Sequence, residues 1–101
     1  MERGGYIYIM TNNATKPLYV GVSSNLSARV WQHKNNVNPG SFTSKYNLHK
    51  LVYFETFESI EEAIEREKQL KRWHREWKLN LIKSVNPTFR DLYDDIKDDY
   101  T

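Results

Sequence analysis

Residue 67 interrupts the apolar face of an otherwise regular helical pattern. Ile60, Ala63 and Ile64 recur at the spacing of one helical face, and the next position of that face is Glu67. A carboxylate directed toward a protein interior costs free energy unless it is paired with a cation or binds a metal ion. Two explanations stay open: an ion pair, with Lys71 one turn later or with a buried arginine, and a metal ligand.

An earlier helical segment of the chain carries an arginine and a histidine on one face. Arg29 and His33 are four residues apart, so their side chains lie one turn from each other. Such a pair alone is usually ordinary helix surface. Two earlier strand-like segments add the phenols of Tyr8 and Tyr19. Together with Glu67, these groups form a set suited to phosphodiester hydrolysis.

Each member of this set has a defined use in that chemistry. One carboxylate suffices to hold Mg²⁺ or Mn²⁺, since such an ion keeps several waters and takes ligands from the substrate phosphate. An arginine neutralises charge on the phosphoryl group. A free tyrosine, with a pKa of about 10, activates water poorly unless cations or a histidine assist it. Gly21, close to Tyr19, leaves room for the substrate to approach the strand.

The segments that must position these groups form a small α+β pattern. Alternating aromatic and β-branched residues predict three strands, at residues 5–10, 18–24 and 50–57. Helical periodicity predicts three helices, at residues 26–36, 59–73 and 75–85. The order β-β-α-β-α-α describes a small three-stranded antiparallel sheet flanked by helices, with the first two strands joined as a hairpin.

Local signals mark two helix starts and one loop. Ser24 or Asn25 caps the first helix, and Ser59 with Glu62 forms a capping box that opens the second. Residues 36–49 are rich in Asn, Pro, Gly and Ser, which predicts a loop without regular structure. We interpret the larger aromatic side chains outside the strands as core or rim packing: Trp31, Tyr46, Trp73 and Trp77.

Basic residues are concentrated between positions 66 and 83, although the 101-residue chain has a net charge of only +2. Of these we take Lys71, Arg72 and Arg75 as candidate substrate-binding residues, because a basic helix is typical of a surface that contacts phosphates. The alternative, a solvated helix face, stays open. Residues 91–101 carry five acids and one base, so we expect residues 88–101 to form an acidic tail, solvated or loosely docked.

Length and composition bound the remaining possibilities. A chain of 101 residues predicts one domain, and the absence of cysteine excludes disulfides and thiolate metal sites. No apolar run approaches the roughly 20 residues that cross a bilayer. We therefore expect a soluble, cytoplasmic protein with no membrane partner, whose oligomeric state is open.

The residues also carry a resemblance to a known family. The segments "YIY" at 6–8 and "YVG" at 19–21, followed by Arg29, His33 and Glu67, resemble the GIY-YIG nuclease domain, in its short stand-alone bacterial form. The resemblance implies a domain over residues 3–87 that cleaves DNA with a divalent metal ion. Relatives include the catalytic domain of a nucleotide-excision-repair protein, so a role in DNA repair or processing is expected.

The resemblance also implies roles for individual residues. Tyr8 and Tyr19 match the tyrosine pair that activates or positions water, and Arg29 matches the phosphate-binding arginine. His33 matches a histidine that assists a tyrosine, Glu67 the single metal ligand, and Gly21 the glycine of the second motif. A family asparagine at the edge of the active site is assigned to Asn86, with Asn80 as the second choice.

This chain departs from the family pattern at two places. Tyr6 stands where the first motif has glycine, and Val22 and Ser23 stand where the excision-repair relatives carry a lysine. His33 therefore has to supply the help that the lysine gives. Two alternatives to the endonuclease stay open: a nucleic-acid-binding module of the same fold with little or no cleavage, and a protein-interaction domain with a vestigial site.

Overall fold

A computed structural model describes residues 4–97 of the chain. Its sheet has three strands: β1 (Gly5–Thr11), β2 (Tyr19–Ser23) and β3 (Lys50–Phe57). The strands are antiparallel and lie in the order β2-β1-β3, so the first strand is central and the second forms an edge. This confirms the predicted α+β fold and its three-stranded antiparallel sheet.

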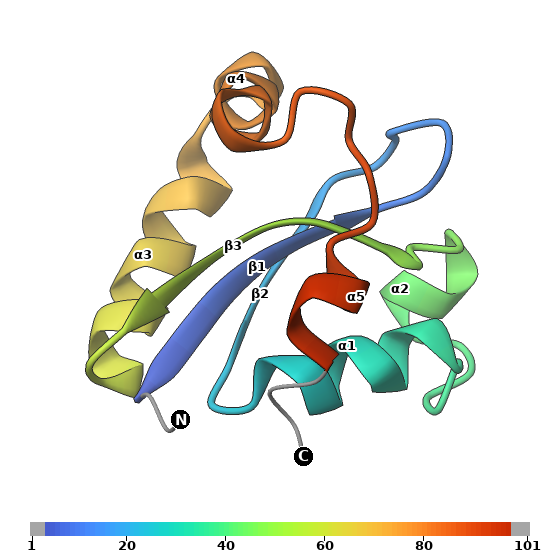
Figure 1. The fold of residues 1–101 in the computed structure, drawn as a ribbon, viewed down its shortest axis with the longest axis horizontal. Helices are drawn as coiled ribbons and strands as arrows, with labels where there is room; N and C mark the ends of the chain where they lie inside the picture. Colours follow the sequence, from blue (N-terminus) through green and yellow to red (C-terminus); the bar gives the residue numbers. More distant parts are fainter. Residues whose placement is uncertain (1–3, 98–101) are drawn as a thin grey trace.

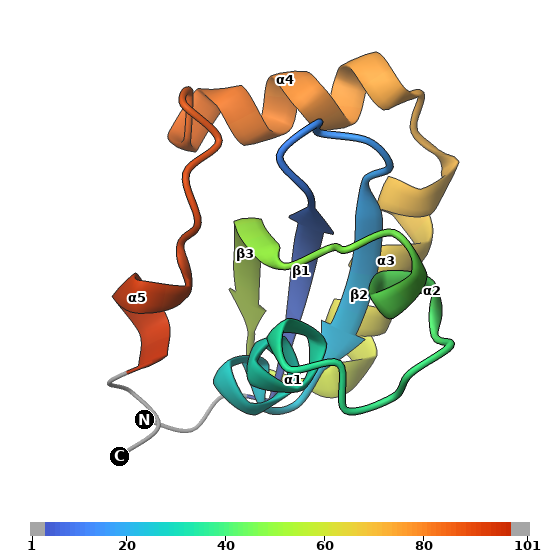
Figure 2. The same ribbon diagram turned by 90° about the vertical axis from the view of Figure 1, so that its right-hand side faces the viewer.

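Helices cover both faces of this sheet. They are α1 (Leu26–Lys34), α2 (Phe42–Lys45), α3 (Ile60–Arg72), α4 (Arg75–Val85) and α5 (Tyr93–Ile96). Figure 1 shows α3 on one side of the strands and α1, α2 and α5 on the other. Figure 2 shows α4 lying across one end of the sheet. No helix among residues 4–97 has the length and apolar character needed to cross a membrane.

The alternation of the strands divides the core into two clusters. Ile7, Ile9 and Val20 point toward α3 and pack with Ala63 and Leu70. The opposite cluster, under α1 and α5, contains Tyr8, Met10, Leu26, Val30, Leu48, Leu51 and Ile96. Tyr8 is therefore a core residue as well as a candidate for chemistry. The burial of these side chains is the main source of the fold's stability.

The predicted helix starts are confirmed. The side chain of Asn25 accepts a hydrogen bond from the Ala28 amide at the start of α1. Ser59 and Glu62 form the expected capping box at the start of α3. These caps satisfy amide groups that have no partner within the helix, and they fix where each helix begins.

The prediction of an irregular loop over residues 36–49 is wrong in its middle. Residues 42–45 form α2, whose N-cap Ser41 accepts a hydrogen bond from the Ser44 amide. Four residues are too few to show a helical period, which is why the sequence pattern does not reveal this turn. Of the four aromatic residues interpreted as core or rim packing, Trp73 packs against the cluster that contains Ile7 and Leu70, while Trp31, Tyr46 and Trp77 are 50%, 41% and 54% exposed and are not core residues.

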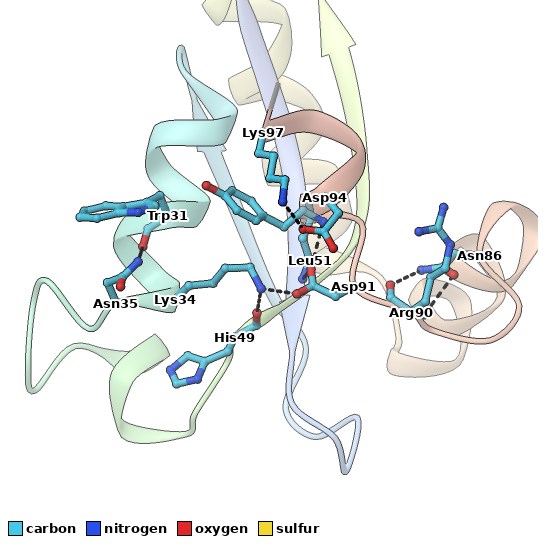
Figure 3. Close-up of polar contacts among 11 residues, drawn as sticks. Trp31, Lys34, Asn35, His49, Leu51, Asn86, Arg90, Asp91, Asp94 and Lys97 are labelled. Carbon is cyan, nitrogen blue, oxygen red and sulfur yellow. Dashed lines mark hydrogen bonds and ion pairs between the residues drawn. The ribbon is translucent and has the colours of Figure 1, made fainter. Parts of the chain in front are cut away.

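Residues 91–96, expected in a solvated or loosely docked tail, are packed against the sheet. The Asp91 carboxylate accepts hydrogen bonds from the Leu51 amide (3.1 Å) and from the Lys34 ammonium group, as Figure 3 shows. The Leu92 amide donates to the Leu51 carbonyl (2.7 Å), and Ile96 is buried in the cluster under α1. This segment completes the core on the α1 side. A domain boundary at residue 87 stays a prediction.

Candidate active site

The Tyr8 phenol lies at the centre of the predicted site. Tyr8 is on the central strand, opposite Gly21 of β2, and its hydroxyl is 3.0 Å from Nε2 of His33 on α1. The ring of Tyr19 completes a group of three, with centroids 6.2 Å from that of Tyr8 and 5.8 Å from that of His33. Two strands and one helix thus bring both tyrosines and the histidine together, as the sequence predicts.

Gly21 has a different role from the one expected. A Cβ atom at this position would lie 2.4 Å from both Cζ and the hydroxyl oxygen of Tyr8. The space above the glycine is therefore filled by the phenol of Tyr8 and is not left open for a substrate. The expectation of a substrate-binding Gly21 is corrected: the missing side chain lets Tyr8 reach His33 across the neighbouring strand.

His33 is held from two sides. Its Nδ1 atom is 2.9 Å from the Thr43 hydroxyl, which in turn is 3.2 Å from the Ser41 hydroxyl. Burial and the nearby Arg29 guanidinium lower the pKa of His33 to about 4, so the ring is neutral at pH 7. A neutral ring has one donor and one acceptor nitrogen. If Nδ1–H donates to Thr43, Nε2 accepts the Tyr8 O–H.

The Tyr8 hydroxyl stays protonated in this setting. Burial raises the pKa of Tyr8 above its ordinary value, and the neighbouring Tyr19 and the Glu67 carboxylate act in the same direction. The Arg29 guanidinium opposes them. Both the arginine and the carboxylate therefore act electrostatically on the same phenol. Tyr19, Arg29 and Glu67 are thus close enough to act on Tyr8, in addition to His33, which contacts its hydroxyl.

Arg29 is available for a ligand. It lies on the exposed side of α1, one turn before His33, and its guanidinium makes no hydrogen bond or ion pair within residues 4–97. A guanidinium offers five donors in a planar fork that matches phosphate oxygens. The position is therefore suited to binding an anion beside the phenol.

Glu67 makes the ion pair that the sequence left as one of two explanations. Its carboxylate lies 3.1 Å from the Lys71 ammonium, and the Glu67 side chain is only 16% exposed. Among residues 4–97, no group of three or more His, Cys, Asp or Glu side chains could enclose a metal ion. A single carboxylate fits Mg²⁺ or Mn²⁺ that keeps its waters and binds substrate oxygens, and it does not fit a zinc site.

The predicted substrate-binding residues fall into separate places. Arg72 lines an open pocket of about 440 Å³ on α3 with Arg66 and Lys68. The Arg75 guanidinium donates a hydrogen bond to the Thr15 carbonyl in the loop between β1 and β2. Lys71 pairs with Glu67, as described above. These cations remain candidates for contacts with a phosphate backbone outside the ring cluster.

Asn86 is not part of the ring cluster. It is buried at the end of α4, where its amide donates to the Val52 carbonyl (3.0 Å) and to the Arg90 carbonyl (2.9 Å). Figure 3 shows Asn86 turned toward Arg90. Val52 is on β3, at the edge of the sheet opposite β2. The amide therefore ties α4 to the sheet, which corrects the expectation that it borders the active site.

Sequence reasoning missed the two hydroxyls that support His33. Thr43 is buried and Ser41 caps α2, but both lie in a segment that the composition marks as loop. The N-cap pattern at Ser41 was the one available signal. No spacing rule relates a histidine on α1 to a threonine ten residues later on α2.

Comparison with known proteins gives the family. A sequence model of the GIY-YIG catalytic domain matches residues 4–80, so the chain belongs to the GIY-YIG family of nuclease domains. It is similar to a UPF0213 protein of Syntrophus aciditrophicus, with 34% identity over 82 residues, 81% of this chain and 92% of the relative. It is also similar to a UPF0213 protein of Clostridium perfringens, with 39% identity over 79 residues, 78% of this chain and 83% of the relative. No solved structure gives a significant match.

The close contact between Gly21 and Tyr8 predicts a specific stability loss. Gly21→Ala forces the phenol of Tyr8 to move, so we expect the free energy of unfolding to fall by about 1–3 kcal/mol, as for other overpacked cores. Urea denaturation measures the loss. In a Tyr8→Leu background, which lacks the end of the ring, the same substitution should cost clearly less. An equal loss in both backgrounds would contradict the assigned contact.

The buried, neutral His33 predicts a low titration midpoint. Because its pKa is lowered from 6.5 to about 4, its NMR signals should not move between pH 8 and 6 and should titrate near pH 4. The unfolded chain binds this proton at higher pH than the folded chain does. Stability from this group is therefore complete above pH 6.5 and declines as pH falls toward 4. His33→Gln should flatten that decline, and a midpoint at or above 6.5 would contradict the assignment.

Proposed function

We propose that this chain is a divalent-metal-dependent endonuclease that hydrolyses DNA phosphodiester bonds. The observation that carries the proposal is the 3.0 Å contact between the Tyr8 hydroxyl and Nε2 of a neutral His33, next to the charges of Arg29 and Glu67. Membership of a nuclease family supports the reaction class. A part in DNA repair stays a prediction.

The Tyr8–His33 pair solves the problem of a phenol that is too weak an acid. The raised pKa of Tyr8 makes a free phenolate unfavourable at pH 7. The phenol can instead pass its proton to His33 Nε2 while its oxygen takes a proton from the attacking water. Tyr8 then ends the step protonated, and the charge resides on His33. The negative phosphate of the substrate favours that imidazolium, because an opposite charge raises a histidine pKa.

Arg29 and Glu67 account for the remaining charges. The Arg29 guanidinium binds a non-bridging oxygen of the scissile phosphate and offsets charge that develops there. Glu67 would hold the divalent ion, which when bound polarises the phosphate and stabilises the leaving oxygen. The hydroxide forms a new bond to phosphorus as the bond to the leaving oxygen breaks. In the structure the Glu67 carboxylate forms an ion pair with Lys71.

A module that only binds nucleic acid does not require this arrangement. Phosphate binding needs exposed cations, which α3 and α4 supply without any buried group. A buried phenol aligned with a neutral imidazole adds nothing to such binding. Phosphodiester hydrolysis uses both groups, and it is therefore the function that these residues support best.

Substitution of Glu67 tests the proposal. Glu67→Gln keeps the size of the side chain and removes the charge that holds the metal, so we expect cleavage of plasmid and flap DNA with Mg²⁺ or Mn²⁺ to fall to background. Glu61→Gln, at an exposed position of the same helix, is the matched control and should cut like the wild type. DNA binding by Glu67→Gln should persist.

Three results would contradict the endonuclease. The first is equal cleavage by the wild type and Glu67→Gln. The second is wild-type cleavage that is unaffected by a chelator. The third is retained binding with no cleavage of any tested DNA under either metal, which would instead support the binding module.

A further inference from the structure

A row of aromatic rings leads from the candidate active site to the surface. The Tyr19 ring stacks on Phe42, with centroids 5.9 Å apart and planes at 30°. Phe42 in turn contacts Tyr46, with centroids 4.8 Å apart. Figure 2 shows α2, which begins at Phe42, beside the edge strand β2 that carries Tyr19. We call Tyr19, Phe42 and Tyr46 the aromatic row.

The outer two rings of this row are exposed without serving the core. Phe42 is 48% and Tyr46 41% exposed, and neither belongs to the two hydrophobic clusters of residues 4–97. The α2 turn is anchored by other means, the Ser41 cap and the buried Thr43. Single exposed aromatic residues are common, but adjacent exposed rings that continue a catalytic cluster are typical of a binding surface.

The row ends at an open pocket with polar and basic walls. Tyr46 lines a pocket of about 460 Å³ together with Asn13, Asn47 and Lys50. The side-chain amides of Asn13 and Asn47 make no hydrogen bond within residues 4–97. The Lys45 ammonium lies 5.6 Å from the centroid of the Tyr46 ring. Flat apolar faces are thus flanked by cations and by free amide groups.

We propose that the aromatic row binds unpaired bases of a DNA strand next to the scissile phosphate, so that the substrate is single-stranded or branched DNA. This inference rests on the endonuclease function proposed above. Bases within a duplex have both faces covered by their neighbours, and only unpaired bases can stack on exposed rings. Lys45 and Lys50 contact the backbone phosphates of the same strand, which gives the charge complementarity that such surfaces have.

Binding measured without cleavage tests this inference. Fluorescence anisotropy in EDTA compares a labelled 12-nucleotide single strand with a blunt duplex of the same sequence, using the full-length chain. Phe42→Ala/Tyr46→Ala should weaken single-strand binding at least tenfold and change duplex binding less than twofold. Trp31→Ala removes an aromatic side chain that is 50% exposed on α1, and it should leave both affinities unchanged. Phe42→Leu/Tyr46→Leu keeps apolar volume, should fold if the alanine pair does not, and should also lose at least tenfold.

The outcomes separate this inference from the proposed function. Unchanged single-strand affinity in a folded double variant overturns the inference, and so does an equal loss for the duplex. Either result can occur while Glu67→Gln still abolishes wild-type cleavage, which leaves the endonuclease standing. Conversely, selective loss of single-strand binding in a chain that never cuts DNA supports the aromatic row and contradicts the endonuclease.

Discussion

The hydrogen bond between Tyr8 and His33 imposes conditions on much of the molecule. Tyr8 is on the central strand and is buried, so its hydroxyl needs a partner inside the protein. The partner comes from α1, which must lie over the sheet at a fixed height. The strand between them must carry glycine, because any side chain at Gly21 would occupy the space of the phenol. Packing and the proposed chemistry thus require the same residues.

Contacts from two sides fix the position of α1. On one side, Thr43 of α2 binds the far nitrogen of His33 and sets the direction of the ring. On the other, the Lys34 ammonium pairs with Asp91 and also donates to the His49 carbonyl (2.8 Å), as Figure 3 shows. Segments that look like a loop and a tail in the sequence therefore hold the helix that presents the histidine. In the proposed mechanism these groups would act by orienting the histidine.

Local periodic features could be predicted from the sequence, whereas contacts between distant segments could not. Strand alternation, the Ser59 capping box and the misplaced Glu67 are local patterns, and each leads to the correct element or to an unusual carboxylate. Thr43 is recognised only when the fold brings it to His33. Asn86 was assigned by order along the chain, but its buried position makes it a structural tie to β3. An asparagine amide can border an active site or connect two parts of the fold, and only its surroundings show which of the two it does.

The central claim is that Tyr8 and His33 act as one proton relay. Single-turnover cleavage rates of Tyr8→Phe, His33→Gln and the double variant test it most directly. Each single substitution should slow cleavage by a factor on the order of 10²–10⁴. The double variant should be no slower than the slower single variant, because the second substitution removes a partner that no longer has a function. Losses that multiply in the double variant would show that the two residues act independently, which contradicts the account.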